Sequence, residues 1–198
     1  MEVKNNTGEK DIEIVELYKK GNEAVLKTLF DRYISPLYNF VSRIANKNDA
    51  ADIVQETFIK VWKNIGSFDP RKASFKTWIF TISRNTATDF LRKKKSILFS
   101  DLDNSSQSDE GSYNNSFVEN IPDESLLPPE SLQKIQDKEF LNKVLENLSA
   151  QSREILALHY QEEMTFAEIG EILEQPLNTV KSKHRRAILE LRKNLEEN

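Results

Sequence analysis

The segment 165–192 combines two features suited to contact with DNA. Thr165 and Glu168 have the spacing of a capping box, in which each side chain satisfies a backbone amide that the first helical turn leaves unpaired. Pro176 cannot lie inside a continuing helix, so the pattern predicts two helices joined by a tight turn near residues 174–176. Between residues 176 and 193 the chain carries six Lys or Arg and one acid. A helix-turn-helix presents such a second helix to base edges and phosphates.

The second of these helices, from about Leu177, is expected to have an inward and an outward face. Val180 begins the inward face, and His184, four residues later, is expected to point the same way. The side chains on or near the outward face are Lys181, Ser182, Lys183, Arg185 and Arg186. A run of charge alone is more typical of a solvated helix. The short link to a supporting helix is what favours a DNA-binding interpretation.

An acidic helix face is the second candidate site. Asp49, Asp52 and Glu56 fall on one face of a predicted helix, with Gln55 beside them. Three interpretations stay open. A metal or acid–base site would need converging histidines, but both histidines of the chain lie beyond residue 150. A solvated face is the second. A docking surface for a basic partner is favoured, because the opposite face of this helix is apolar and is expected to face the core.

A second cationic segment, between residues 60 and 95, carries ten Lys or Arg and two acids. Its aromatic and aliphatic side chains, among them Trp78 and Ile82, are expected in the core. The polar side of its helix carries Arg84, Asn85, Thr88, Arg92, Lys93, Lys94 and Lys95. A loop over residues 68–75, beginning with Phe68, precedes the helix. Cations beside aromatic side chains suit single-stranded DNA, because cations hold the backbone and pockets take unstacked bases.

Apolar periodicity predicts that helices carry all these side chains. The expected helices cover residues 11–20, 24–46, 49–65, 74–95, 132–148 and 149–160, followed by the helix-turn-helix. Asp49 and Ser149 are expected to cap two of them. The helix over 49–65 is expected to bury Ile53, Val54, Phe58, Val61 and Trp62.

Between Phe99 and Gln133 the chain carries eight acids and no base, among Ser, Asn and Pro. Such a segment buries too little apolar surface to offset the entropy of ordering it. The sequence therefore predicts an all-α protein of two small helical domains, residues 1–97 and 133–198. A flexible acidic linker at 98–132 joins them, and the C-terminal domain contains the helix-turn-helix.

The composition restricts where and how the chain acts. It has no cysteine, which excludes a disulfide framework and cysteine-ligated metal. The N-terminal residues lack the apolar core of a signal peptide, and no run approaches about 18 apolar residues. A soluble, cytoplasmic protein without membrane insertion is expected. The net charge of −4 is compatible with binding DNA because positive charge is concentrated in two segments.

Three motifs, in this order along the chain, resemble regions two and four of bacterial sigma-70 family sigma factors. They are DAADIVQETFIKVW at 49–62, FKTWIFTISRNTATDFLR at 75–92 and LSAQSREILALHYQEEMTFAEIGEILEQPLNTVKSKHRRA at 148–187. Region three is lacking, as in the extracytoplasmic-function (ECF) group. The resemblance implies a promoter-specificity subunit that binds core RNA polymerase, recognises −35 and −10 promoter elements and promotes DNA melting. It implies no enzyme activity, cofactor or metal.

The resemblance also implies roles for particular residues. The helix that docks on the clamp helices of the largest polymerase subunit supplies Asp49, Asp52, Gln55 and Glu56. The −10 element is contacted by Phe68, Arg84, Asn85, Thr88 and Arg92, of which Asn85 reads an extruded base. The −35 element is contacted by Thr179, Lys181, Ser182, Arg185 and Arg186, with Thr179 on a phosphate. The flap of the second-largest subunit is a further partner, and the acidic linker follows the RNA exit path.

Two residues depart from the family pattern. Glu174 stands where the family commonly has Gly, and His184 replaces a usual aliphatic residue. A stand-alone helix-turn-helix regulator is the alternative function. A metal-dependent hydrolase built on Asp49, Asp52 and Glu56 lacks further ligands. The sequence leaves open which promoters are read and whether an anti-sigma factor binds.

Overall fold

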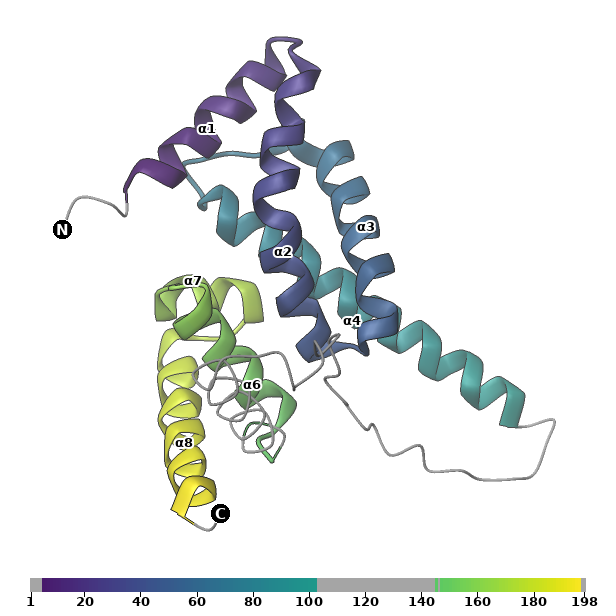
Figure 1. Cartoon of the computed structure of the whole chain (residues 1–198), viewed down its shortest axis with the longest axis vertical. Helices are drawn as coiled ribbons and strands as arrows, with labels where there is room; N and C mark the ends of the chain where they lie inside the picture. The colour runs from purple at the N-terminus through teal and green to yellow at the C-terminus, as the bar shows by residue number, and fades with distance from the viewer. Residues whose placement is uncertain (1–4, 103–144, 146, 197–198) are drawn as a thin grey trace, which may run out of the picture.

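The computed structural model describes residues 5–102, 145 and 147–196, without the side chains of residues 5–7, 96–102, 195 and 196. Within these ranges the chain forms helices and no strand, which confirms the all-α prediction (Figure 1). The acidic linker predicted at 98–132 and the helix predicted over 132–148 lie almost entirely outside the described residues. No described helix has the length and apolar character needed to cross a membrane.

The N-terminal unit contains four α-helices. They are α1 (Asn5–Lys19), α2 (Leu26–Ile44), α3 (Lys47–Asn64) and α4 (Phe75–Leu102), with 3-10 turns η1 (Glu23–Val25) and η2 (Ile65–Ser67). In Figure 1, α2 and α3 lie side by side and α4 crosses behind them. Helix α2 buries one apolar face, made of Leu26, Leu29, Tyr33, Leu37, Phe40 and Val41. Phe40 packs on Phe80 of α4 with ring centroids 5.2 Å apart. Amphipathic packing of α2 and α3 on α4 thus forms this core.

Three details of this unit differ from the sequence-based expectations. Helix α4 continues past residue 95 to Leu102. Asn46, not Asp49, is the N-cap residue of α3. Asp49 instead accepts a hydrogen bond from Lys94 of α4 at 2.7 Å, so a carboxylate in the first turn is used to pair two helices. Trp62 is 54% exposed because it lies on the outer edge of α3, whereas Val61 is fully buried.

The C-terminal unit contains α6 (Ala150–Leu156), a π-helical turn η4 (Ala157–Gln161), α7 (Phe166–Leu173) and α8 (Leu177–Glu196). Ser149 caps α6 as predicted, because its hydroxyl accepts a hydrogen bond from the Ser152 amide at 3.1 Å. The capping box of Thr165 and Glu168 is also confirmed. The predicted turn before α8 is present.

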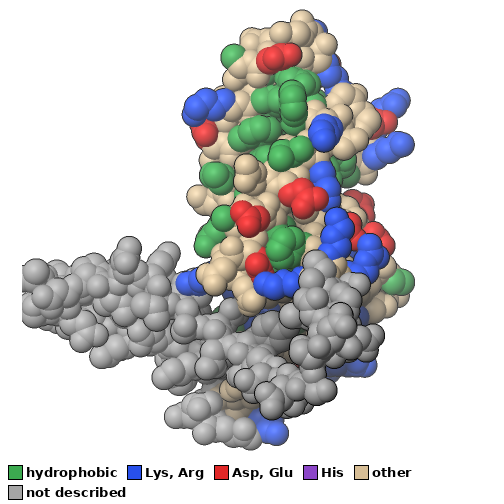
Figure 2. All heavy atoms as spheres, turned by 90° about the vertical axis from the view of Figure 1, so that its right-hand side faces the viewer, with side chains coloured by type: hydrophobic (Ala, Val, Ile, Leu, Met, Phe, Trp, Pro, Cys, Tyr) green, Lys and Arg blue, Asp and Glu red, His purple; other side chains and the backbone are tan. Residues whose placement is uncertain are grey.

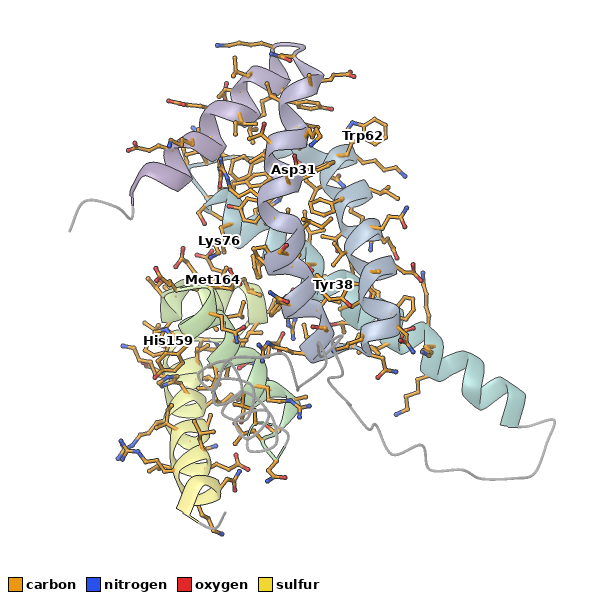
Figure 3. The ribbon with its side chains drawn as sticks, in the orientation of Figure 1. Asp31, Tyr38, Trp62, Lys76, His159 and Met164 are labelled. Carbon is orange, nitrogen blue, oxygen red and sulfur yellow. The ribbon has the colours of Figure 1, made fainter. Side chains whose placement is uncertain are left out.

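The two units pack against each other. Helix α7 lies against α4, and α6 lies against the end of α2 (Figure 1). Three side chains of α4 make polar contacts across this junction. Lys76 Nζ lies 2.9 Å from a carboxylate oxygen of Glu162, Thr77 Oγ1 lies 3.4 Å from Glu168 Oε1, and Arg84 Nε lies 3.1 Å from Glu154 Oε1. Lys76 extends toward the loop before α7, near Met164 (Figure 3). The buried apolar cluster is continuous across the junction.

Candidate functional site

The outer face of α8 is the first candidate site. Val180 and Ala187 are fully buried and fix the inner face of the helix. The predicted contacts Lys181, Ser182, Arg185 and Arg186 are all exposed, and Thr179 is half-buried at the helix start. Lys183 differs from its neighbours, because its ammonium donates to the side-chain oxygens of Gln151 at 2.8 Å and Gln175 at 2.9 Å. It links α8 to the rest of its unit.

The turn between α7 and α8 depends on two residues with unusual geometry. Glu174 ends α7 with φ 54° and ψ 44°, the left-handed conformation that glycine adopts most easily. Gly170 approaches the turn so closely that an added Cβ would lie 2.8 Å from the carbonyl oxygen of Gln175. The sequence analysis did not single out Gly170. A glycine inside an otherwise apolar helix was the available signal.

Histidine and aromatic rings hold α8 from the inside. His184 packs on Phe166 and His159 with ring centroids 5.0 and 5.1 Å apart. His159 stacks on Phe166, and its Nδ1 lies 2.9 Å from the carbonyl oxygen of Met164. Burial, and then the charge of His159, lower the pKa of His184. His184 therefore faces inward, and its ring favours the neutral form.

A pocket beside α4 is the second candidate site. It has a volume of about 360 Å³ and is lined by Lys60, Asn64, Ser67, Trp78, Ile82, Asn85 and Thr86. Asn85 is exposed, so its amide can offer one acceptor and two donors to a group entering the pocket. Trp78 and Ile82 supply an apolar wall, and Lys60 Nζ lies 3.1 Å from Thr86 Oγ1. This combination suits a flat, polar-edged ring.

Phe68 lies in the core, although the loop around it borders this pocket. Its side chain is 4% exposed and packs on Phe75 and Trp78, with ring centroids 5.5 and 5.3 Å away. This burial does not favour direct contact between the Phe68 ring and DNA. The next residue, Asp69, accepts hydrogen bonds from Arg71, which hold the pKa of Asp69 at about 2. The loop is therefore locally ordered.

The other polar residues of α4 have partners of their own. Arg84 is ion-paired with Glu154 of α6 and is half-buried. Thr88 is exposed, and its hydroxyl donates to the Arg84 carbonyl at 2.9 Å. Arg92 is exposed and lies 3.0 Å from Asp89. The structure thus leaves Thr88 and Arg92 accessible and engages Arg84 in the junction between units.

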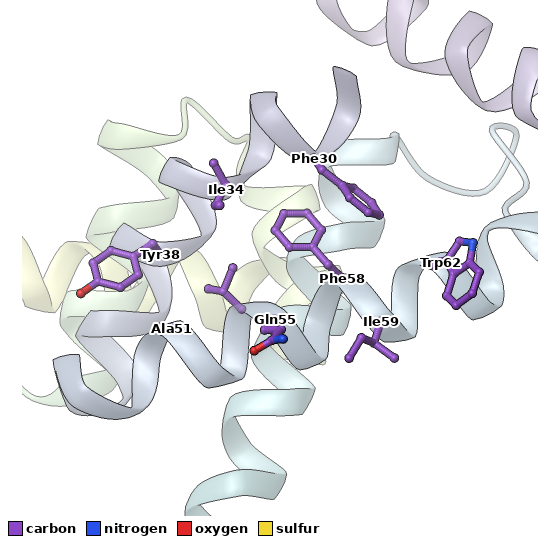
Figure 4. A pocket seen from close by; sticks show the side chains of 9 residues that line it. Phe30, Ile34, Tyr38, Ala51, Gln55, Phe58, Ile59 and Trp62 are labelled. Carbon is purple, nitrogen blue, oxygen red and sulfur yellow. The ribbon is translucent and has the colours of Figure 1, made fainter. Parts of the chain in front are cut away.

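An apolar groove between α2 and α3 is the third candidate site. Its volume is about 380 Å³, and it is lined by Phe30, Ile34, Tyr38, Ala51, Val54, Gln55, Phe58, Ile59 and Trp62 (Figure 4). Apolar side chains gather on this side of the molecule with acids among them (Figure 2). The expectation that the apolar side of α3 is entirely committed to the core is wrong at Trp62, which is 54% exposed. Ile59, on the same side of the helix as Asp52 and Glu56, is 43% exposed.

The predicted polymerase contacts lie around this groove. Gln55 lines it, and Asp52 is exposed nearby on α3. Glu56 is half-buried and lies 3.1 Å from Lys60, whereas Asp49 is paired with Lys94. Within the described residues, no group of three or more His, Cys, Asp or Glu side chains could hold a metal ion. The arrangement is that of an apolar groove with polar side chains on the helix beside it.

These features define a helical DNA-binding protein with a C-terminal helix-turn-helix and a separate apolar groove. Family models for Sigma-70 region 2 and Sigma-70, region 4 match residues 29–97 and 144–193. The ECF RNA polymerase sigma factor SigW of Bacillus subtilis is 31% identical over 178 residues, which are 89% of this chain and 92% of SigW. The chain therefore belongs to the sigma-70 family of RNA polymerase sigma factors, in the ECF group.

Further relatives agree with this assignment. The ECF RNA polymerase sigma-E factor of Escherichia coli K12 is 30% identical over 178 residues, 88% of each chain. The fold also resembles that of the sigma factor RpoE in complex with the anti-sigma factor NepR from Bartonella quintana. The TM-score is 0.64 at 24% identity, over 86% of this chain and 96% of that chain. The fold is also similar to that of CnrH in complex with the cytosolic domain of CnrY. The TM-score is 0.61 at 20% identity, over 93% of this chain and 96% of that chain.

The function follows from the family. The chain is a promoter-specificity subunit that acts with RNA polymerase in transcription initiation, and the stand-alone regulator is not favoured. Sigma factors are generally regulators of initiation that act by binding, not by catalysing a reaction.

Proposed function

We propose that three surfaces of this sigma factor divide the work of initiation. The groove between α2 and α3 docks core polymerase, the pocket at Asn85 takes an unstacked base of the −10 element, and the outer face of α8 reads the −35 element. The observation that carries the proposal is the Asn85 pocket. The pocket joins the exposed amide of Asn85, the apolar wall of Trp78 and Ile82, and the cation Lys60 of α3. Asn85 itself lies on α4, a helix of high positive charge.

For docking, the groove offers an apolar centre with acids at its edge. Ile59 and Trp62 present large side chains to solvent, and Asp52, Gln55 and Glu56 lie on the same helix. Interfaces commonly combine a desolvated apolar centre with a polar rim, and complementary charge at the rim steers association. A pair of helices with apolar and basic side chains fits this surface. The clamp helices of the largest polymerase subunit are the proposed partner.

At the −10 element, the energetic problem is to hold a base outside the stack. Unstacking costs roughly a few kcal/mol, which a pocket offsets by hydrogen bonding to the base edge and by apolar contact with the ring. Asn85 is proposed to supply the hydrogen bonds and Trp78 the apolar contact. Arg92 and Thr88, exposed further along α4, are proposed to contact the backbone. Phe68 is proposed to shape the loop from inside.

At the −35 element, the exposed side chains of α8 are proposed to enter the major groove. Arg185 and Arg186 are candidates for bidentate hydrogen bonds to guanine, and Lys181 and Ser182 for further polar contacts. Thr179, at the start of the helix, is proposed to contact a phosphate. The C-terminal unit is also proposed to bind the flap of the second-largest subunit.

The packed arrangement of the two units favours an inactive state. Arg84 is a proposed −10 contact, yet its guanidinium is paired with Glu154 of the C-terminal unit. Only 22% of the Arg84 side chain is exposed at this junction, so we expect contact of Arg84 with DNA to be easier when the units separate. Solved structures of similar fold contain an anti-sigma factor or the cytosolic domain of CnrY as the partner. An anti-sigma factor that favours the packed arrangement is proposed for this chain too.

The Asn85→Ala substitution tests the central step. In the holoenzyme, it should reduce open-complex formation on a duplex promoter. A template already mismatched across the start region should restore much of that loss, because the unpairing cost has been removed. Permanganate reactivity of unpaired thymines measures the opening, and Asn39→Ala, which removes an exposed amide from α2, is the matched control. Full opening by Asn85→Ala with unchanged preference among −10 sequences would contradict the proposal.

A further inference from the structure

A second cavity lies where α2 meets the C-terminal unit. Its volume is about 240 Å³, and its lining is Arg43, Leu145, Arg153, Leu156, Ala157, Tyr160, Gln161, Ile188 and Leu191. Arg43 comes from the last turn of α2, and the other residues come from the C-terminal unit. None of the residues proposed above to contact polymerase or DNA lines this cavity. Its interior is mostly apolar, with two arginines in the wall.

Arg43 is in an unfavourable environment in the absence of a further partner. Its Nε is buried and has no hydrogen-bond partner among the described residues. Burial lowers the pKa of Arg43, and the nearby charge of Arg153 lowers it further. The charge of Glu162 raises the pKa of Arg43. The Glu162 carboxylate, however, is already ion-paired with Lys76, at 2.9 Å. A buried donor of this kind normally has a partner, so its presence beside a cavity calls for an explanation.

We propose that this cavity binds a small organic carboxylate with an apolar body, such as an aliphatic acid, with the carboxylate on Arg43 and the chain among Leu156, Ile188 and Leu191. A planar guanidinium can donate two parallel hydrogen bonds to a carboxylate, and we assign this contact to the two terminal nitrogens of Arg43, because Nε itself is buried. The negative charge of the ligand would also offset part of the cost of burying this guanidinium. The apolar lining excludes a ligand that is charged throughout, such as a nucleotide. The volume is below the range of roughly 300 to 1,000 Å³ typical of drug-sized ligands, which favours a small molecule.

A ligand at this place would contact both units at once. Its carboxylate would bind α2, and its apolar chain would bind side chains of α6, η4 and α8. Binding that requires both units stabilises the arrangement in which they are packed. The site therefore couples a small acid to the packed state of this sigma factor.

Decanoate is the probe for the full-length protein, compared with decanol, with decanoate kept below its critical micelle concentration and decanol below its solubility limit. Calorimetric titration should show that decanoate binds roughly 10- to 100-fold more tightly than decanol, as expected for charge-assisted hydrogen bonds. Arg43→Gln should remove this preference and Arg43→Lys should restore part of it, because Lys keeps the charge but not the planar donor pair. Arg71→Gln removes an exposed arginine that does not line the cavity and should leave the preference intact.

Three results would overturn the proposal. Equal affinity for decanoate and decanol would show only apolar binding, of the kind the groove between α2 and α3 could also provide. A preference for decanoate that Arg43→Gln leaves unchanged would place the ligand elsewhere. If decanoate binds only after the eight acids between residues 99 and 133 are replaced by Asn or Gln, the chain's own acids fill the site, and an external ligand is excluded. Should Arg43→Gln unfold, Leu191→Trp, which fills the cavity, should abolish the same preference.

Discussion

Arg84 of α4 and Glu154 of α6 form an ion pair across the junction of the two units, with Nε and Oε1 3.1 Å apart. Both side chains are largely buried, and burial raises the pKa of Glu154 more than the charge of Arg84 lowers it. The pair joins residues 70 positions apart in the sequence. It connects a helix proposed to bind the −10 element with the unit proposed to bind the −35 element.

Glu154→Gln should loosen this junction. The substitution keeps the shape but leaves the Arg84 charge without an acid, which should cost roughly 1 to 3 kcal/mol of unfolding free energy. Because the chain has no cysteine, spin labels can be placed at Asp31→Cys and Glu190→Cys alone. The distance distribution between the labels should broaden in Glu154→Gln. Glu171→Gln, an exposed acid on α7, is the control, and the same narrow distribution in all proteins would contradict a role for the pair.

Ile59→Asp should weaken binding to core polymerase. Ile59 is 43% exposed at the groove, and an aspartate there would place an unpaired charge in a desolvated interface. We expect affinity to fall at least about tenfold, or roughly 1.4 kcal/mol, with little change in melting temperature. Titration with labelled core measures the affinity. Leu17→Asp introduces the same charge at an equally exposed position on α1, and an equal loss there would remove the groove from the interface.

Arg186→Ala should relax sequence preference within the −35 element. If Arg186 is bidentate to a guanine, its loss should cost about 1 to 3 kcal/mol at one base pair. Arg192→Ala, an exposed arginine one and a half turns further along α8, should weaken matched and scrambled sequences equally. Binding of the holoenzyme to both promoter types at fixed salt provides the comparison. Identical behaviour of the two variants would reject Arg186 as a base reader.

Glu174→Gly should stabilise the helix-turn-helix. Glu174 adopts φ 54°, where glycine avoids the clash between Cβ and the backbone. A gain of about 0.5 to 1 kcal/mol is expected, because the greater freedom of glycine in the unfolded chain offsets part of the benefit. Glu171→Gly, inside α7, should instead destabilise by about 1 kcal/mol. Denaturant unfolding of both variants measures the two changes in unfolding free energy. Destabilisation by Glu174→Gly would contradict the idea that the left-handed backbone at Glu174 is strained.

His184 should make the C-terminal unit less stable in acid. Burial lowers the pKa of His184 below its ordinary value of 6.5, so the unfolded chain takes up the proton more readily than the folded chain. The contribution of neutral His184 to the free energy of unfolding is complete above pH 6.5, the pKa of an unperturbed histidine. It is lost as the pH falls from 6.5 toward the lower pKa of His184 in the folded chain. Melting temperature should decline less between pH 7.5 and 5.5 in His184→Leu. Equal slopes for both proteins would rule out His184 as the source.

Much of the local structure could be predicted from the sequence. The capping box at Thr165, the cap at Ser149 and the turn at Pro176 each depend on residues within one or two helical turns, and the structure contains all three. The inward face of α8 followed from the spacing of Val180 and Ala187. Such features are encoded locally because hydrogen bonds and apolar periodicity within a helix involve near neighbours.

The tertiary structure decided which surfaces are open and which charges are paired. Trp62 was expected in the core, and Phe68 in a loop that contacts DNA, but their exposed fractions are 54% and 4%. Neither value follows from helical spacing, since each depends on where α2 and α4 pass. In the same way, the sequence gives no ion-pair partner for Arg84, whereas in the structure Arg84 is ion-paired with Glu154. Distant segments must meet before such a pair exists, and their meeting is determined by packing of the whole chain.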